Sequence, residues 1–459
     1  MKMILLVEPG YKNKYPPLGL MKIATYHKFR GDYVSFVKGC NPLLLNQKWD
    51  RVYISTLFTF HWKKSLETIL FYRPTVESNE QIIVGGVMAT LLSNEIRKET
   101  GARVLEGLLD KPGILDANDK QIIDTLPPDY NILNNIEYKY GIDDAYIGYA
   151  TRGCPNHCGF CAVNRLEPTY INYLPIMKQI QSIERLYGAK QNLILLDNNV
   201  LASNKFEQII KDIRDLGFEK GARYNGKTRW VDFNQGIDVR LLTKNKMELL
   251  STINIKPLRL AFDHISLKDK YVRCIRQAVK CDITSLSNYV LYNYTDTPQD
   301  FYERLKINVK LNKELGIHIY SFPMKYIPLN AKDRNYIGKN WNRRLLRGVQ
   351  CILLATMGKV GTNLEFFKAA FGETEEEFIE IAMMPDEYII NRAKNKFTKA
   401  SAWRKEYRKL SNKERRNFID LFRDYNHVMV SLKKDYPRLA SHYCIKAPVL
   451  PQPMAVLEP

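Results

Sequence analysis

Apolar and polar residues alternate in blocks along the first quarter of the chain. Short apolar runs that fit buried strands occur at residues 4–7, 34–37, 52–55 and 81–84. Residues 21–29 carry apolar positions at helical spacing. Strands separated by helical segments are typical of a parallel sheet with crossover helices. The last of these strands runs into Gly85 and Gly86, where the lack of side chains lets another backbone or a ligand come close.

A second alternating region begins near residue 145. Apolar runs that fit strands lie at residues 145–149, 193–196, 230–233, 258–262, 289–292 and 317–321. Helical patterns lie between them, and two have start signals: Thr243, and Thr297 followed by Pro298. Six strand–helix repeats in this length predict a parallel barrel, complete or partial. An open doubly wound sheet is the alternative.

The pattern changes after Pro328, and the last third of the chain is predicted to be helical. Two pairs fit capping boxes, Thr374 with Glu377 and Ser411 with Glu414. Between them, one helical face carries the apolar residues Phe397, Ala400, Trp403, Tyr407 and Leu410. The predicted fold class is therefore α/β, with an N-terminal Rossmann-like parallel sheet, a partial (β/α)6 barrel and a helical C-terminal domain.

The length of the chain fits several domains, because 459 residues are too many for one compact core. We place a Rossmann-like domain, a linker, a barrel and a basic helical domain at residues 1–110, 111–144, 145–330 and 331–459. No apolar run approaches the ~20 residues of a bilayer span. Glu8 interrupts the first apolar run too early for a signal peptide. We expect a cytoplasmic protein without a membrane partner.

The charge of the chain is strongly positive. Lys and Arg number 69 against 49 Asp and Glu, a net charge of +20, and residues 391–434 alone hold 14 basic and 4 acidic residues. Such a surplus attracts polyanions, either nucleic acid or an anionic membrane surface. The last third also interleaves tryptophan with arginine, at Trp341, Trp403, Arg343, Arg344, Arg347 and Arg404. This combination suits base stacking and phosphate contacts, and an amphipathic helix with a solvated basic face is the alternative.

The segment TRGCPNHCGFCAVNRLEP directly follows a predicted strand. Its cysteines, Cys154, Cys158 and Cys161, have the spacing C-x3-C-x2-C. Three thiolates on one loop can hold a single iron–sulfur cubane and leave one iron open to a small molecule. A loop after a barrel strand lies at the end of the barrel where active sites collect. A zinc site that uses His157 is the alternative, but zinc ribbons usually have a second close cysteine pair, which the chain lacks.

Five further cysteines are scattered along the chain, at Cys40, Cys274, Cys281, Cys351 and Cys444. In a long chain without a signal peptide, they do not form a disulfide framework. Isolated cysteines are more often small buried apolar residues than ligands. We therefore expect no second cluster.

The run TRGCPNHCGFC closely resembles the cluster motif of the radical S-adenosylmethionine (SAM) superfamily, and the resemblance extends to about Pro328. It implies a partial barrel, a 4Fe–4S cluster on the three cysteines, and SAM bound to the open iron. It also implies that the reduced cluster cleaves SAM to a 5′-deoxyadenosyl radical, which abstracts hydrogen from a substrate. A reductant protein such as flavodoxin or ferredoxin is the implied partner.

The same resemblance extends to residues of a SAM site. Phe160 corresponds to a residue along the adenine, and Asp197 and Asn198 in LLDNNVL lie where the SAM amino group is recognised. The commoner Gly-Gly-Glu is absent there, and a turn capped by Asn or Asp is the alternative. Further candidates, with either cofactor-binding or structural roles, are Asn234, Gln235, Asp238, Arg240, Arg259 and Asp263. Residues that either line a substrate cavity or pack the barrel are Tyr292, Asn293, Tyr294, Phe322, Met324 and Lys325.

The first predicted domain resembles the cobalamin-binding domain that precedes the barrel in many radical SAM proteins. The resemblance rests on YPPLGLMKIATY and IIVGGVMAT, whereas the Asp-x-His-x-x-Gly signature with its cobalt-ligating His is absent. Two roles stay open. Either cobalamin binds without a protein ligand, with its tail against Gly85 and Gly86, or the domain only supports the barrel.

Together these features predict a radical SAM enzyme. The expected substrate is a nucleobase or nucleotide in a nucleic acid, whether tRNA, other RNA or DNA, bound through the basic C-terminal domain. One alternative is cobalamin-assisted radical methylation or rearrangement of a small molecule or peptide. Another is a non-catalytic, nucleic-acid-binding iron–sulfur protein.

Overall fold

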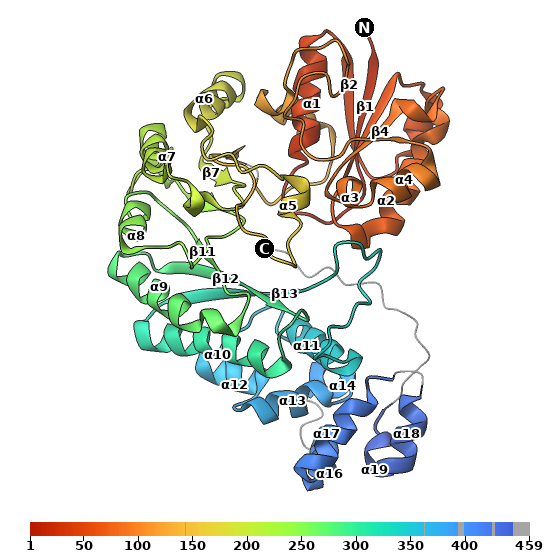
Figure 1. Cartoon of the computed structure of the whole chain (residues 1–459), viewed down its shortest axis with the longest axis vertical. Coiled ribbons are helices and arrows are strands. Elements are labelled where there is room, and N and C mark those ends of the chain that lie inside the picture. Colours follow the sequence, from red (N-terminus) through yellow and green to blue (C-terminus); the bar gives the residue numbers. More distant parts are fainter. Residues whose placement is uncertain (143, 362, 393–398, 425–426, 444–459) are drawn as a thin grey trace. The chain divides into compact units, whose positions relative to one another are not determined.

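The computed structural model describes the chain except for residues 143, 362, 393–398, 425–426 and 444–459. Cys444, Phe397 of the predicted apolar stripe and the C-terminal run 451–459 lie outside the described residues. The chain forms two compact units (Figure 1). The first unit comprises Met1–Lys256 and Ile327–Tyr336, and the second comprises Pro257–Tyr326 and Ile337–Glu458. The four-part division at residues 110, 144 and 330 stays a prediction.

The first unit opens with a five-stranded parallel sheet. Its strands are β1 (Met3–Glu8), β2 (Tyr33–Lys38), β3 (Arg51–Thr56), β4 (Ile82–Gly86) and β5 (Arg103–Val104), in the order β2-β1-β3-β4-β5. The four predicted strands are confirmed. The two-residue β5 is too short to leave an apolar run in the sequence. The strand order reverses between β1 and β3, as in a doubly wound sheet.

Both faces of this sheet are covered, which explains why its strands are uninterrupted apolar runs. Leu5 and Val7 pack on the side of α2 (Trp62–Tyr72), α3 (Val87–Leu91) and α4 (Ser93–Thr100). Ile4 and Leu6 pack on the side of α1 (Leu18–Phe29). The predicted linker also packs on that side, through Leu115 and the short helices η5 (Ile123–Thr125) and η6 (Tyr130–Asn135).

Six further parallel strands form two sheets of three. In the first unit, β6 (Ala145–Gly148), β7 (Asn192–Leu195) and β10 (Val231–Phe233) pair in the order β10-β7-β6. In the second unit, β11 (Leu258–Ala261), β12 (Ser285–Tyr292) and β13 (His318–Lys325) pair in that order. All six occur where the apolar runs predicted them. A hairpin of β8 (Arg223–Tyr224) and β9 (Lys227–Thr228) was not predicted.

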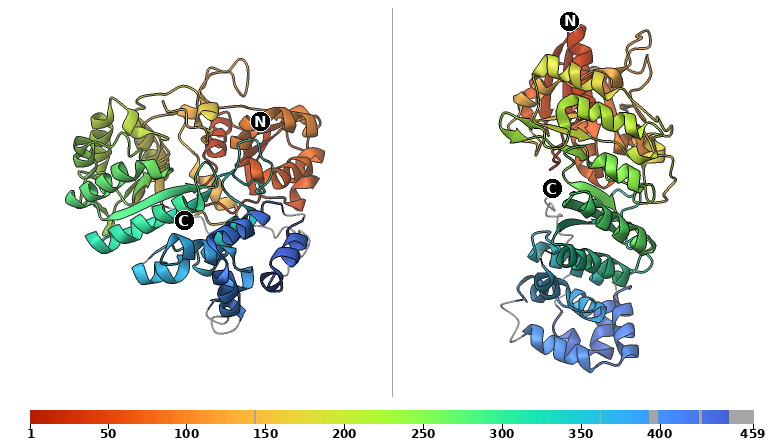
Figure 2. Two further views of the ribbon diagram at one scale, coloured as in Figure 1. Left: turned by 60° about the horizontal axis from the view of Figure 1, so that its bottom comes forward. Right: turned by 90° about the vertical axis from the view of Figure 1, so that its left-hand side faces the viewer.

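Helices connect these strands as the alternating pattern predicts. They are α5 (Val163–Leu166), α6 (Ile176–Tyr187), α7 (Phe206–Ile213), α8 (Lys244–Leu250), α9 (Lys268–Lys280) and α10 (Pro298–Leu315). Thr243 caps α8 by accepting a hydrogen bond from the Lys246 N–H, and Thr297 forms a capping box with Asp300 at the start of α10. In the second unit, α10 packs against β12 and β13 (Figures 1 and 2).

The remainder of the second unit is helical, as predicted. Its helices are α11 (Arg343–Ala355), α12 (Leu364–Phe371), α13 (Glu375–Met383), α14 (Asp386–Ile390), α16 (Lys399–Lys409), α17 (Asn412–Leu421), α18 (Val428–Asp435) and α19 (Pro437–Ala440). They share one apolar core with α10, and Ser411 and Glu414 form the predicted capping box of α17. Thr374 caps α13 by accepting from the Glu377 N–H. The α/β class with parallel sheets and a helical C-terminal part is confirmed, whereas closure of the six strands into a partial barrel stays a prediction.

Short helical turns complete the description. They are Pro42–Asn46, Thr59–His61, Arg73–Thr75, Asn79–Gln81, Val200–Ala202 and Ile265–Leu267, together with the π-turn Arg214–Phe218. Among the described residues, no helix combines the length and apolar character needed to cross a membrane.

Candidate cluster and cofactor site

The three cysteines lie on the loop that leaves β6 and precedes α5. All three thiols are half-buried, and His157 between them is exposed. The Cys161 N–H donates to the Cys158 carbonyl at 3.0 Å, which closes a turn between these two cysteines. Phe160 is half-buried inside that turn. The loop therefore presents three thiols from one short segment at the carboxyl end of a parallel strand, where barrel active sites collect.

Hydrogen-bond donors surround the sulfur atoms of this loop. The Asn156 backbone N–H and the Asn199 side-chain amide both donate to Cys154 Sγ, each at 3.4 Å. Hydrogen bonding to Asp238 raises the pKa of Arg240 above its usual value, and the neighbouring Cys158 raises it further. N–H groups and a guanidinium beside sulfur are typical of the surroundings of metal-binding cysteines.

The donor set fits an iron–sulfur cluster better than a single metal ion. Within the described ranges, no three His, Cys, Asp or Glu side chains lie close enough together to hold one metal ion. A cubane differs from a single ion because each thiolate binds a different iron, so its ligands are more widely spaced. Three thiols on one short loop can each bind a different iron of one cluster.

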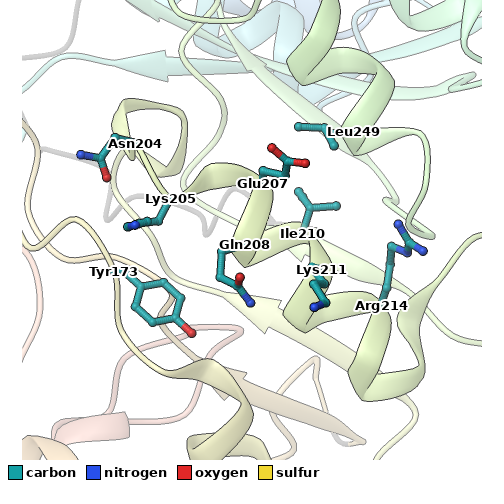
Figure 3. A pocket seen from close by; sticks show the side chains of 9 residues that line it. All are labelled: Tyr173, Asn204, Lys205, Glu207, Gln208, Ile210, Lys211, Arg214 and Leu249. Atoms are coloured by element: carbon teal, nitrogen blue, oxygen red, sulfur yellow. The ribbon is translucent and has the colours of Figure 1, made fainter.

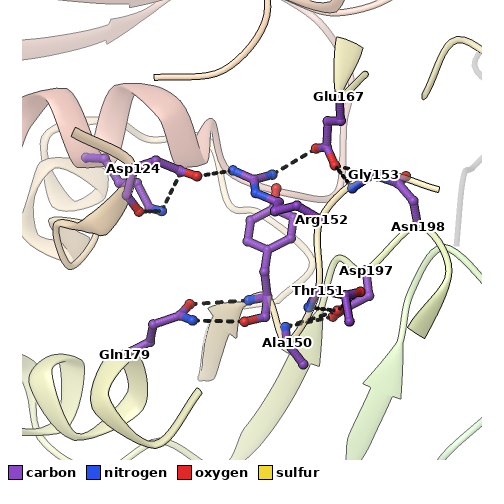
Figure 4. A network of polar contacts seen from close by, with 11 residues as sticks. Asp124, Ala150, Thr151, Arg152, Gly153, Glu167, Gln179, Asp197 and Asn198 are labelled. Carbon is purple, nitrogen blue, oxygen red and sulfur yellow. Dashed lines mark hydrogen bonds and ion pairs between the residues drawn. The ribbon is translucent and has the colours of Figure 1, made fainter. Parts of the chain in front are cut away.

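A buried ion-pair network fixes the first half of the loop (Figure 4). The Arg152 guanidinium bonds the Glu167 carboxylate at 2.9 Å and the Asp124 carboxylate at 2.5 Å. The second Glu167 oxygen accepts from the Gly153 N–H at 2.6 Å, and Asp124 also bonds Lys22 of α1 at 2.8 Å. Asp124 lies in the segment predicted as a linker. That segment therefore connects the first sheet to the cysteine loop.

Asp197, which lies just after β7, accepts hydrogen bonds from the chain that leads into the same loop. Its carboxylate accepts hydrogen bonds from the Ala150 N–H at 3.0 Å, the Thr151 hydroxyl at 2.6 Å and the Thr151 N–H (Figure 4). Burial raises the pKa of Asp197 to about 6, and these hydrogen bonds oppose the shift. Asp197 therefore orients the backbone that enters the cysteine loop, and its oxygens are already occupied.

The two residues after Asp197 differ in their contacts. Asn198 donates its amide to Glu167 at 2.9 Å. Asn199 is 3% exposed, and no hydrogen-bond donor in the described part of the chain reaches its carbonyl oxygen Oδ1. Asn199 therefore combines a contact to the Cys154 sulfur with an unsatisfied buried acceptor. Sequence reasoning named Asp197 and Asn198 and missed Asn199, although all three follow β7 in the run DNN.

The loop after β10 supplies the other predicted residues of the first unit. Asp238 and Arg240 lie beside the cysteine loop, where Arg240 bonds Asp238 in bidentate fashion at 2.8 and 2.7 Å. Asn234 donates to the Tyr15 hydroxyl, and Gln235, which is exposed, donates to Asn234 at 3.2 Å. The structure therefore groups Asp238 and Arg240 with the cysteines, whereas Asn234 contacts Tyr15 in the segment after β1 and Gln235 bonds Asn234.

Gly85 and Gly86, predicted to contact a cobalamin tail, end strand β4. A Cβ on Gly86 would lie 2.2 Å from the Thr56 carbonyl oxygen, and Gly86 has φ of 99°. The first N–H groups of α3 are also engaged, because Met88 donates to the Leu57 carbonyl at 2.7 Å and Ala89 to the Thr56 hydroxyl at 3.0 Å. The close approach at Gly86 is therefore made by the chain's own backbone, so these groups do not fit a tail site.

In the second unit, α10 covers one face of the sheet β11-β12-β13. Ser321 bonds Asn308 of α10 at 2.8 Å, which fixes the covered face. Strand alternation then places Tyr289, Tyr320 and Phe322 on the opposite face. There the Phe322 ring contacts both tyrosine rings in tilted arrangements, with its centre 5.9 Å from that of Tyr289 and 4.6 Å from that of Tyr320.

Two further residues lie on the face of the sheet opposite α10. The Arg259 guanidinium lies 6.0 Å from the Phe322 ring centre, and Met324, at the end of β13, is 47% exposed. This face carries aromatic, thioether and guanidinium groups.

The remaining predicted residues of the second unit have structural contacts. Tyr292 packs into the core against Trp341, and Asn293 is fully buried and accepts from the Gly338 N–H at 2.7 Å. Asp263 offers its carbonyl to the buried Arg304. Tyr294 and Lys325 are half-buried.

The interleaved tryptophans and arginines do not form a stacking surface. Trp341 and Trp403 are 1% and 0% exposed. Their neighbouring arginines are paired with acids of the same unit: Arg344 and Arg347 with Asp386, Arg404 with Glu377 and Glu380. The proposed base stacking by these tryptophans is wrong, because both rings are core residues of an amphipathic helical layer.

A separate groove lies along the outer face of α7 (Figure 3). It encloses about 720 Å³ and is lined by Tyr173, Asn204, Lys205, Glu207, Gln208, Ile210, Lys211, Arg214 and Leu249. Tyr173 and Gln208 both bond the buried Asp212, each at 2.7 Å. None of the lining residues belongs to the predicted site, and the groove adds no chemistry to the cysteine loop.

No protein-family model and no curated protein sequence matches the chain. Among solved structures, it is similar to the radical SAM methyltransferase TsrM from Kitasatospora setae, determined with its tryptophan substrate and a SAM analogue. The identity is 13%, the alignment covers 76% of each chain, and the TM-score is 0.50.

The chain is also similar to OxsB, a cobalamin-dependent SAM radical enzyme determined with aqua-cobalamin and SAM. The identity is 16% and the TM-score 0.50, over 67% of this chain and 52% of that chain, so this chain spans about half the length of OxsB. At such identities the likeness establishes the fold alone. The class is an α/β protein in which a doubly wound parallel sheet precedes two three-stranded parallel sheets, with a three-cysteine loop after the first of their strands. The chain shares this fold with the radical SAM enzymes TsrM and OxsB, in agreement with the sequence resemblance.

Proposed function

We propose that the chain is a radical SAM enzyme in which Cys154, Cys158 and Cys161 hold a 4Fe–4S cluster. The observation that carries this proposal is the half-buried three-cysteine loop directly after β6, with N–H donors on the sulfur of Cys154. When bound, the cluster supplies the electron that cleaves SAM to a 5′-deoxyadenosyl radical, which abstracts hydrogen from substrate. The fold shared with TsrM and OxsB supports this assignment.

Two residues beside the cysteine loop offer contacts for SAM. The unsatisfied Asn199 carbonyl oxygen is a buried acceptor next to Cys154, and an ammonium group is the donor that such an acceptor requires. We assign the SAM amino group to Asn199 in place of Asp197 and Asn198, whose side chains bond the loop and Glu167. Phe160, in the turn between the second and third cysteines, stays our candidate for the adenine contact.

The electron comes from outside the chain. A low-potential one-electron donor such as flavodoxin or ferredoxin is therefore the proposed partner. Its docking to the basic chain would weaken as ionic strength rises, because carriers of this kind are acidic.

The substrate is proposed to be a small molecule or a peptide with a planar apolar group. The face of the sheet β11-β12-β13 opposite α10 supports this class, since Tyr289, Tyr320 and Phe322 place three aromatic rings together there. A nucleic-acid substrate loses its main support because Trp341 and Trp403 are core residues.

Cobalamin-assisted methylation or rearrangement is the second candidate reaction. It is favoured by the similarity to TsrM, a methyltransferase, and to OxsB, which is cobalamin-dependent. The geometry at Gly85 and Gly86 gives no place for the cofactor's tail. We therefore derive no reaction step through cobalamin. Its binding is measured directly, by the absorption spectrum of protein incubated with hydroxocobalamin and desalted.

The decisive experiment is anaerobic reconstitution with iron and sulfide, followed by reduction with SAM present and quantification of 5′-deoxyadenosine. The wild-type chain is expected to form it and Cys158→Ala is expected not to. Cys281→Ala, a half-buried cysteine at the end of α9, is the matched control and should behave as wild type. A wild-type chain that binds no cluster, or equal product from Cys158→Ala, would overturn the proposal.

The same preparation separates the substrate classes. Binding of tRNA or DNA is titrated at several salt concentrations, because a nucleic-acid partner shows a steep salt dependence. We expect weak binding without a dependence on sequence. Tight binding that stimulates 5′-deoxyadenosine formation would restore the nucleic-acid assignment.

A further inference from the structure

Asp238 lies at the centre of the polar contacts around the cysteine loop. Its carboxylate accepts from the Asn156 side-chain amide at 3.0 Å and from the Asn199 amide at 3.4 Å. It also accepts two side-chain hydrogen bonds and one backbone hydrogen bond from Arg240, at 2.7 to 3.0 Å. One carboxylate therefore holds three residues that come from three different loops.

Each of these three residues also contacts the cysteine loop's sulfur or lies beside it. The Asn156 N–H and the Asn199 amide reach Cys154 Sγ, and Arg240 lies beside Cys158. Asp238 itself donates nothing and touches no sulfur in these contacts. Its position explains why the donors point to the thiolates, since the amides and the guanidinium are oriented through their bonds to its oxygens.

Donors on cluster sulfur have a defined electrostatic effect. One-electron reduction adds one negative charge, which is shared between the cluster and its thiolates. N–H groups and positive charge near the sulfur stabilise that charge, so they raise the reduction potential. Losing a donor makes the potential more negative, and reduction by a given donor protein becomes less favourable.

We propose that Asp238 is a positioning residue that aims Asn156, Asn199 and Arg240 at Cys154 and Cys158 and thereby raises the reduction potential of the cluster. The inference rests on the proposed function, because it requires the three cysteines to hold the cluster. It assigns to Asp238 and Arg240 a role in setting the potential, in place of the cofactor contacts predicted from the sequence.

The first test measures the midpoint potential by dithionite titration with redox mediators, without SAM, and follows the reduced cluster by electron paramagnetic resonance. Asn199→Leu removes the amide donor at similar volume and without a change in charge. We expect the equilibrium constant for one-electron reduction to fall about tenfold, which corresponds to about 59 mV. Asn204→Leu makes the same chemical change at an exposed position in the α7 groove and should leave the potential unchanged.

Asp238→Asn tests the positioning role through the direction in which the reduction potential of the cluster changes. Removing a nearby negative charge would by itself raise the potential. Losing the alignment of three donors lowers it, and we expect a more negative potential. Asp215→Asn, an exposed carboxylate in the same unit, is the matched control. A raised or unchanged potential in Asp238→Asn, with the cluster intact, overturns the positioning role.

Iron content and visible absorption separate this inference from the proposed function. A wild-type chain without a cluster overturns both. A wild-type chain with a cluster, and an Asn199→Leu variant with the wild-type potential, overturn only the inference. If Asn199→Leu takes up no cluster, Arg240→Gln at its exposed side chain is titrated instead. A more negative potential is again expected, and an unchanged one contradicts the proposal.

Discussion

Two carboxylates near the cysteine loop have opposite pKa shifts because their surroundings differ. Burial raises the pKa of Asp197 to about 6, and its neutral hydrogen-bond donors do not cancel that effect. Burial also raises the pKa of Asp238, but hydrogen bonds from Arg240 and Asn156, together with the charge of Arg240, lower it below its usual value. Asp238 is therefore a charged anchor near neutral pH, whereas Asp197 titrates in a mildly acidic range.

Asp197 makes stability depend on pH. Its folded-state pKa is higher than the ordinary value of 3.8, so its contribution is most favourable in acid and is lost as pH rises through about 6. The loss between pH 4 and pH 6 is about 2 kcal/mol. Asp197→Asn should lack this titration, so its stability deficit relative to wild type should shrink as pH rises. Urea denaturation across that range measures the difference, and parallel profiles would contradict the expectation.

A substitution at Gly86 tests how closely β4 packs against Thr56 of β3. Gly86→Ala places a Cβ against the Thr56 carbonyl oxygen at positive φ, and we expect a loss of about 2–5 kcal/mol in the free energy of unfolding. Gly31 has φ of 77° but nothing within 4 Å of an added Cβ, so Gly31→Ala carries only the backbone cost of about 1 kcal/mol. Equal losses in the two variants would show that the Thr56 contact does not matter.

At the scale of elements, the cysteine loop depends on neighbours far away in the sequence. Its strand and its spacing follow from local patterns, because apolar runs and closely spaced thiols are visible in a short window of sequence. The contacts that hold the loop in place do not follow from such local patterns. Glu167 and Asp124 bond Arg152 from opposite sides of the loop, and nothing in the local sequence distinguishes them from solvated acids.

Arg152→Met removes the central residue of the ion-pair network with Glu167 and Asp124. It leaves these two carboxylates without their guanidinium partner. We expect a loss of about 3–5 kcal/mol in stability and lower iron uptake on reconstitution. Arg165→Met, on α5 close to Glu167 but exposed, is the control and should retain both properties. Full iron uptake by Arg152→Met would show that the cysteine loop holds its geometry without the ion pairs.

At the scale of the whole molecule, several basic residues of the C-terminal helices are engaged in internal ion pairs. Arg404 and Arg408 of α16 bond Glu377 and Glu380 of α13, and the aromatic stripe through Trp403 and Tyr407 faces the core of the second unit. A positive net charge therefore does not by itself define a nucleic-acid surface. Exposed cations such as Lys413 and Arg416 remain available for non-specific contacts.

Trp403 measures how strongly that core stabilises the second unit. Trp403→Ala should lower the free energy of unfolding by about 3–5 kcal/mol, because it opens a cavity among buried rings. Val430→Ala on α18 is the matched control, since Val430 is 69% exposed and should change stability by less than about 0.5 kcal/mol. Circular dichroism during urea denaturation measures the free energy of unfolding of both variants. A Trp403→Ala variant as stable as wild type would contradict the placement of Trp403 in the core.

The sequence by itself determined the order of strands and helices, the caps at Thr243, Thr297 and Ser411, and the cysteine spacing. These features depend on residues that are close together along the chain, so a local pattern carries them. The tertiary structure decided which polar groups meet. The contacts of Asn199 and Asp238 with the cysteine loop, and the contact of Gly86 with Thr56, join segments tens of residues apart. Such pairings arise when the strands align and leave no periodic signal in the sequence.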